Sequence, residues 1–92
     1  MKIFSSELYE NQLKEILQEL LKIDFDSTQK FKLYLDTIII NIPTKASKYK
    51  KSIYYDDENV KDIEYEDYTV TFHIDTNKEN YLILSIYKKT HK

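Results

Sequence analysis

The sequence predicts one α+β domain in which an N-terminal strand and a helical hairpin precede an antiparallel sheet of three or four strands. Two patterns support this fold class. Between Ser6 and Ile42, apolar residues recur at helical spacing, whereas from Asp62 to Lys89 apolar and polar residues alternate as they do in strands. A chain of 92 residues buries only one small core, so residues 1–92 are expected to form a single domain.

A short strand and a helix are expected at the start of the chain. Lys2–Phe4 is strand-like and is expected to join the sheet, and Ser5 or Ser6 is suited to cap the following helix. The helix is predicted from about Ser6 to Lys22, because apolar residues recur there at helical spacing opposite polar ones. The apolar residues are Leu13, Ile16, Leu17, Leu20 and Leu21.

A second helix is expected after a short connection. Asp26 is predicted to cap it, with Gln29 reaching back to complete a capping box. Pro43 is predicted to stop the segment, because proline has no amide hydrogen to donate. The apolar residues of this segment are Phe31, Leu35, Ile38, Ile39 and Ile42. Two amphipathic helices with a short connection are expected to form an antiparallel hairpin that covers the sheet.

The second half of the chain is expected to consist mainly of strands. Thr44–Lys51 is interpreted as a polar loop rich in lysine, and Ser52–Tyr55 as a candidate short strand. Alternating residues predict further strands at about Val60–Tyr65, Tyr68–Asp75 and Tyr81–Lys88. The last of these is apolar on both faces, which is typical of a central strand.

Alternate residues of the middle strand form an apolar and a polar set, so one face is expected to join the core and the other to be free. The apolar set is Val70, Phe72 and Ile74, and the polar set is Thr69, Thr71, His73 and Asp75. The chain contains no Gly. Its turns, expected at Glu66-Asp67 and at Thr76–Lys78, must therefore be made by residues that accept positive φ less readily.

Composition narrows the classes of function. The chain has no Cys, so disulfides and thiolate chemistry are excluded, and it shows neither a signal peptide nor an apolar run of membrane length. We therefore expect a cytoplasmic protein with no membrane partner. All fourteen basic residues are Lys and the formal net charge is −2, which gives no general attraction to nucleic acid. Neither a metal site nor a cofactor is expected.

Two segments, Ser52–Asp62 and Asp67–Asp75, resemble the RelE/ParE superfamily of bacterial toxins. The opening Met1–Ser5, the helical hairpin and the final Ile83–Lys88 are similar to that family too, so the resemblance covers nearly the whole chain. It implies the toxic half of a type II toxin–antitoxin pair, held inactive by a cognate antitoxin. Members that resemble RelE cleave mRNA on the ribosome, whereas ParE-like members inhibit DNA gyrase.

One departure from the family pattern favours the second activity. RelE-like nucleases usually place an Arg just after the tyrosine that corresponds to Tyr68, and this chain has Thr69 there. A nuclease without metal needs cations to stabilise the phosphorane, and a threonine does not supply one. We therefore expect a non-catalytic, ParE-like inhibitor of gyrase. The first alternative is a metal-independent mRNA endoribonuclease, and the second is an inactive family member that only binds other proteins.

Candidate site residues come mainly from two basic segments. The candidate partner-binding residues are Lys48, Tyr49, Lys50, Lys51, Tyr87, Lys88, Lys89 and His91. The candidate catalytic residues for the nuclease alternative are Lys50, Lys51, His73, Tyr87 and Lys89. For the lysine run we favour a solvated surface over a phosphate or partner site, and for His73 simple exposure on a strand. The tyrosines of the second half fit a binding surface and cross-strand packing equally well.

Overall fold

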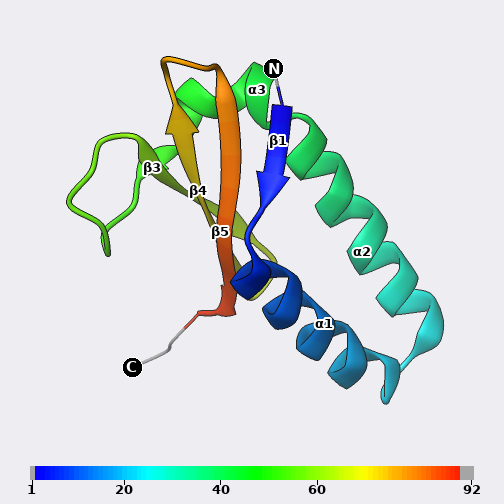
Figure 1. The fold of residues 1–92 in the computed structure, drawn as a ribbon. Helices are drawn as coiled ribbons and strands as arrows, with labels where there is room; N and C mark the ends of the chain where they lie inside the picture. The colour runs from blue at the N-terminus through cyan, green and yellow to red at the C-terminus, as the bar shows by residue number, and fades with distance from the viewer. Residues whose placement is uncertain (1, 90–92) are drawn as a thin grey trace.

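The computed structural model describes residues 2–89 and has the α+β fold that the sequence predicts (Figure 1). A short strand, β1 (Lys2–Ser5), leads into the helices α1 (Glu7–Leu21) and α2 (Phe25–Ile40). These helices form the expected hairpin and lie on one side of the sheet, as Figure 1 shows. The remaining strands are β2 (Lys50–Lys51), β3 (Val60–Tyr65), β4 (Tyr68–Asp75) and β5 (Asn80–Lys88).

The five strands form one mixed sheet in the order β1-β5-β4-β3-β2. The last four strands pair antiparallel, whereas β1 runs parallel to β5 and places Ile3 opposite Tyr81. The N-terminal strand thus joins the edge of the sheet, as expected. Because β1 and β4 flank it, β5 lies inside the sheet, which explains why it is apolar on both faces.

Ser6, one of the two predicted capping residues, fixes the start of α1. Its hydroxyl oxygen accepts a hydrogen bond from the Tyr9 amide at 2.9 Å, and the hydroxyl donates to the Leu84 carbonyl at 2.7 Å. The Gln12 side chain, six residues later, accepts a hydrogen bond from the Ile86 amide at 2.9 Å. Two polar side chains therefore attach α1 to the central strand of the sheet.

The cap of α2 corrects a prediction, because Asp24 rather than Asp26 occupies that position. The Asp24 carboxylate accepts hydrogen bonds from the amide and the hydroxyl of Ser27, at 3.3 Å and 2.5 Å. The bond from the hydroxyl is the main cause that lowers the pKa of Asp24 below its ordinary value. Asp26 lies in the first turn, where a negative charge favours the helix without capping it.

The segment after α2 is more ordered than the predicted loop Thr44–Lys51. It contains α3 (Ile42–Lys45), a short 3₁₀ helix, η1 (Ala46–Lys48), and β2. Pro43 follows the end of α2 and lies in the first turn of α3, where a helix needs no amide hydrogen from it. The loop prediction is therefore wrong, since polar composition hid two helical turns that carry the buried residues Ile42 and Ala46.

The predicted strand Ser52–Tyr55 is also wrong. The Ser52 amide donates to the Val60 carbonyl at 2.8 Å, and its hydroxyl oxygen accepts from the Tyr54 amide at 3.3 Å. The first bond still joins Ser52 to β3, and the second folds the chain into a turn, so the strand ends after only two residues. Residues 52–59 instead form a long connection, which we call the β2–β3 loop.

The sheet has a helix-side face and an outer face. The helix-side face carries the core, in which Leu35, Phe72 and Ile83 are completely or almost completely buried. The outer face was expected to be free, but Thr69 and Thr71 on it are buried. That prediction is wrong because long side chains of the neighbouring strands and the β2–β3 loop cover the centre of this face.

Two turns use glutamate in the left-handed region. Glu66 has φ 53° in the β3–β4 turn, and Glu79 has φ 54° in the β4–β5 turn. The positions of both turns agree with the prediction to within a residue or so. A residue with a Cβ pays a steric cost at positive φ, which the surrounding strand pairs must offset.

Candidate functional site

Strand register brings several of the predicted site residues together on the outer face. Lys50 pairs with Asp62, and Asp62 in turn pairs with Thr71. One step further toward the end of the sheet, Thr69 lies between Glu64 on β3 and Tyr87 on β5. Because alternate residues of a strand point to the same side, these side chains share one face.

The centre of this face is a polar cluster around Tyr87. The Thr71 hydroxyl donates a hydrogen bond to the Asp62 carboxylate at 2.8 Å. The Tyr87 hydroxyl is buried beside them and has no hydrogen-bond partner among residues 2–89. The ring of Tyr54 from the β2–β3 loop contacts the Tyr87 ring edge-on, with a centroid distance of 6.0 Å.

Tyr87 is held in its neutral form by this environment. Burial is the main cause that raises its pKa above the ordinary value of 10.0, and the nearby Asp62 adds to the increase. The Thr71 hydroxyl partly offsets the rise in pKa. A neutral phenol without a hydrogen-bond acceptor suits packing or proton donation, and it does not suit service as a base near neutral pH.

Most of the candidate cations, on either face of the sheet, are matched by carboxylates. The Lys89 ammonium pairs with Glu64, and the Lys51 ammonium lies 3.8 Å from an oxygen of Asp56. His73 is likewise 3.9 Å from Asp57, measured between Nε2 and Oδ2. Lys50 differs from these residues, since it is exposed and has no ion pair within residues 2–89.

The candidate catalytic residues do not converge on one point. His73 and Tyr87 align with positions four residues apart along β4, which corresponds to about 13 Å along the strand. Lys51 follows Lys50 directly and therefore points to the helix-side face. The arrangement provides one unpaired lysine and a buried phenol, which is less than cleavage of a phosphodiester without metal requires.

The candidate partner-binding residues are divided between different surfaces. The ring of Tyr49 packs edge-on against Phe72, with a centroid distance of 5.9 Å, so this side chain belongs to the core. Lys48 is exposed at the end of η1, and Lys88 points to the helix-side face of β5. His91 lies outside the described residues.

Sequence reasoning missed a groove between the tip of the helical hairpin and the end of the sheet. Two adjoining cavities of about 560 and 450 Å³ share Leu20, Tyr68 and Lys88. Apolar side chains from both helices form their walls, and the rim carries four carboxylates and two lysines. The apolar residues are Ile16, Ile23, Phe31 and Tyr34, the acidic residues are Glu15, Glu19, Glu66 and Asp67, and the lysines are Lys30 and Lys88.

One sequence signal for this groove existed. Ile23 is a large apolar residue in the short connection between the two helices, where side chains are usually exposed. It is indeed 83% exposed. Nearby Phe25 and Tyr34 are also more than half exposed. Large apolar residues gathered on one surface mark an interaction site more often than scattered ones do.

The site carries no obvious metal centre or membrane element. In the part of the chain that the structure describes, no three His, Cys, Asp or Glu side chains gather where they could hold a metal ion. Within the same residues, none of the helices combines the length and the apolar character that crossing a membrane would require.

Comparison with known proteins adds no assignment to this geometry. The sequence matches no protein-family model, and it has no match among curated protein sequences. The fold, the outer face and the groove are therefore the features that bear on the function of this chain.

Proposed function

We propose that this chain is the toxin component of a bacterial type II toxin–antitoxin system, acting in the cytoplasm. Its mode of action in this proposal is ParE-like: it inhibits DNA gyrase by binding, without catalysis, and a cognate antitoxin neutralises it. The order of strand, helical hairpin and antiparallel strands agrees with the resemblance to the RelE/ParE superfamily. This agreement supports the family, and the chemistry of the outer face supports the mode of action.

The observation that carries the proposal is the pairing of cations with carboxylates. The charge of Lys89 is offset by Glu64 where a nuclease would need it free, and the His73 imidazole lies beside Asp57. Thr69, which occupies the position of the expected arginine, is buried and offers no charge. A surface of this kind can recognise a partner, but it stabilises a pentavalent phosphorane poorly.

The exposed part of the β2–β3 loop supplies a contact surface for the target. Ile53 and Tyr54 are 83% and 67% exposed, and Lys48 and Lys50 lie near the start of the loop. Exposed aromatic and apolar side chains with basic neighbours are common at the centre of protein interfaces. In this proposal the loop, rather than the half-buried Tyr87, contacts gyrase.

The groove at the tip of the hairpin provides a separate surface for the antitoxin. Its walls are apolar and its rim has more carboxylates than lysines. An amphipathic antitoxin segment with basic residues would match both properties. Neutralisation would then act at a surface different from the one that meets the target.

One observation favours mRNA cleavage as a second candidate. Lys50 has no ion pair among residues 2–89, and the Tyr87 hydroxyl lies beside Asp62 with no hydrogen-bond partner. A lysine and a tyrosine can act as electrostatic stabiliser and proton donor. In this alternative, RNA binding would displace Tyr54 and uncover the hydroxyl.

Induced expression in a bacterial host tests the proposal directly. We expect growth arrest with DNA damage, and purified protein should block supercoiling by gyrase while leaving translation in a cell extract intact. Translation arrest with cut mRNA would instead support the second candidate. Normal growth together with unaffected supercoiling would contradict both.

A pair of variants separates the two proposed surfaces. Tyr54→Ala should abolish gyrase inhibition, because it removes the exposed ring of the loop, and should leave antitoxin binding intact. The matched control Tyr34→Ala removes a similarly exposed ring from the groove, so it should keep gyrase inhibition and weaken neutralisation. Equal effects of both variants in the two assays would refute the division of surfaces.

A further inference from the structure

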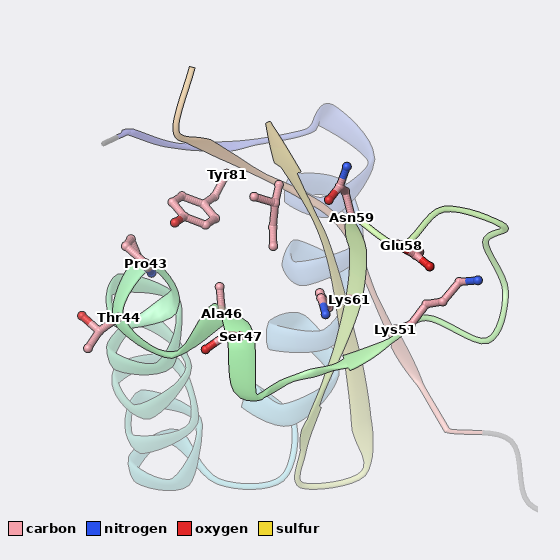
Figure 2. A pocket seen from close by; sticks show the side chains of 10 residues that line it. Pro43, Thr44, Ala46, Ser47, Lys51, Glu58, Asn59, Lys61 and Tyr81 are labelled. Atoms are coloured by element: carbon pink, nitrogen blue, oxygen red, sulfur yellow. The ribbon is translucent and has the colours of Figure 1, made fainter. Parts of the chain in front are cut away.

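A third cavity, which shares no lining residue with the groove, opens on the helix-side face of the sheet (Figure 2). It has a volume of about 600 Å³ and lies between the short helical segments after α2 and the strands β2 to β5. Thr44 and Ser47 come from the helical side, Lys61 from β3 and Tyr81 from β5, as Figure 2 shows. The volume is in the range of small-molecule sites, roughly 300–1,000 Å³.

Lys61 is the unusual residue of this cavity. The next two residues on the same face of β3, Ile63 and Tyr65, are buried in the core, and the cross-strand partner Phe72 is completely buried. Lys61 is itself half-buried, and its ammonium group has no ion pair or hydrogen bond among residues 2–89. A cation in an apolar row without a counter-ion is costly unless something else compensates it.

A second lysine increases this cost. Lys51 on β2 is the direct cross-strand partner of Lys61, and like charges in that position destabilise a sheet. Lys51 extends toward Glu58 in Figure 2, and its ammonium lies 3.8 Å from an oxygen of Asp56. Lys51 thus has the carboxylates of Asp56 and Glu58 near it, whereas Lys61 has no ion pair among residues 2–89, so the uncompensated charge of the cavity is that of Lys61.

Neutral donors surround the same space. The hydroxyls of Thr44 and Ser47 and the amide of Asn59 line the cavity, and these side chains form no hydrogen bond within residues 2–89. Pro43, Ile74 and the ring of Tyr81 add apolar surface to the lining. The cavity thus combines a lysine and neutral donors with apolar surface.

We propose that this cavity binds a small phosphate monoester, with the phosphate group on Lys61 and the organic part against Pro43 and Ile74. Phosphate offers the acceptor oxygens that an ammonium and two hydroxyls can satisfy together. Its charge would relieve the repulsion between Lys51 and Lys61. This site does not presuppose the proposed toxin activity, although Glu58 and Asn59 of its lining belong to the β2–β3 loop that is proposed to contact gyrase.

Titration of the purified protein tests the site. Inorganic phosphate, adenosine monophosphate and a short single-stranded RNA without terminal phosphate are each added at constant ionic strength, while thermal unfolding and backbone amide NMR shifts are recorded. Adenosine monophosphate at ten times its dissociation constant should raise Tm by roughly 5–10 °C. The shifted amides should be those of Ser47, Asn59 and Lys61. Inorganic phosphate should shift the same amides more weakly.

Two variants make the result specific. Lys61→Met fits the apolar row, so it should fold at least as stably as the wild type and lose the ligand-dependent rise in Tm. The control Lys14→Met removes an exposed lysine from α1 and should keep that rise. An equal rise in all three proteins would mean a general salt effect and would overturn the site. Binding of the RNA oligonucleotide through Lys61 would overturn the choice of a small monoester, and no shift with any ligand would overturn both.

Discussion

The two faces of the sheet differ in where an unpaired lysine lies, because Lys50 on the outer face is exposed whereas Lys61 on the helix-side face is half-buried. On the outer face, Lys89 and His73 each have a carboxylate neighbour, and the polar centre around Asp62 is covered by the β2–β3 loop. On the helix-side face, the core is apolar and Lys61 is left without an ion pair among residues 2–89. The paired charges of the outer face agree with the proposed recognition surface, and the half-buried, unpaired Lys61 is the basis of the proposed ligand site.

The largest expected difference between the two faces is the loss of stability when a large side chain is removed. Phe72→Ala should lower the free energy of unfolding by about 3–5 kcal/mol, because it leaves a cavity at a completely buried site. Urea unfolding followed by circular dichroism measures this loss. The matched outer-loop variant Tyr54→Ala should cost less than about 1 kcal/mol, since that ring is mostly exposed. Similar losses for both variants would show that the loop is as much a part of the core as Phe72.

Alkaline unfolding provides a second difference, carried by Tyr9 on the helix-side face. Its hydroxyl is buried with no hydrogen-bond partner among residues 2–89, and burial is the main cause that raises its pKa, with Asp36 and Glu10 adding to the effect. Its pKa is therefore higher in the folded state than the ordinary value of 10.0. The contribution of Tyr9 to stability should be constant below about pH 10 and should fall above it, because the unfolded chain then releases the proton first.

The expected slope from Tyr9 alone is about 1.4 kcal/mol for each pH unit above 10. Tyr9→Phe should remove this part of the slope, as measured by urea midpoints between pH 9 and pH 11.5. Tyr87→Phe serves as the comparison from the outer face, where the pKa is also raised. If Tyr9→Phe leaves the alkaline slope unchanged, burial of this phenol is not what makes the protein sensitive to high pH.

The outer-face cluster should depend on the hydrogen bond between Thr71 and Asp62. Thr71→Val keeps the shape of the buried side chain and removes the donor, so we expect a loss of about 1–2 kcal/mol. A double-mutant cycle with Asp62→Asn measures the coupling in equilibrium unfolding. A coupling energy near zero would mean that the two side chains are adjacent without stabilising each other.

The ion pair between Lys89 and Glu64 should have the smallest effect. Both side chains are partly exposed, so Lys89→Met should change stability by less than about 1 kcal/mol. High salt should reduce even that difference, which a comparison of unfolding at low and high ionic strength would reveal. A loss of stability that is larger than this and insensitive to salt would show that the pair is shielded from solvent.

Local sequence patterns were sufficient for most of the fold. Helical spacing predicted α1 almost to its ends, and alternation predicted β3, β4 and β5 because each of these strands has a buried side. The cap of α2 was missed since Asp24 and Asp26 both suit that role, and only the length of the connection distinguishes them. Alternation also failed at Ser52–Tyr55, where a side-chain hydrogen bond of Ser52 turns the chain.

The site was less predictable, because it depends on register and on contacts between distant segments. No local pattern indicates that Lys89 meets Glu64 or that Tyr54 covers Tyr87. The burial of Thr71 likewise follows from neighbours on other strands. Lys61 is the exception, since a lysine alternating with Ile63 and Tyr65 is visible in the sequence as a polar residue in an apolar row.

The parallel pairing of β1 with β5 has a consequence for how the chain is made. Ser6 and Leu84, which join the first helix to the central strand, are separated by 78 residues. At roughly 5–20 residues per second, a ribosome takes about 4–16 s to synthesise the chain between them. During that interval β1 has no strand to pair with and α1 has no sheet to cover. A growth inhibitor with this topology would reach its active shape only when its own synthesis is nearly complete.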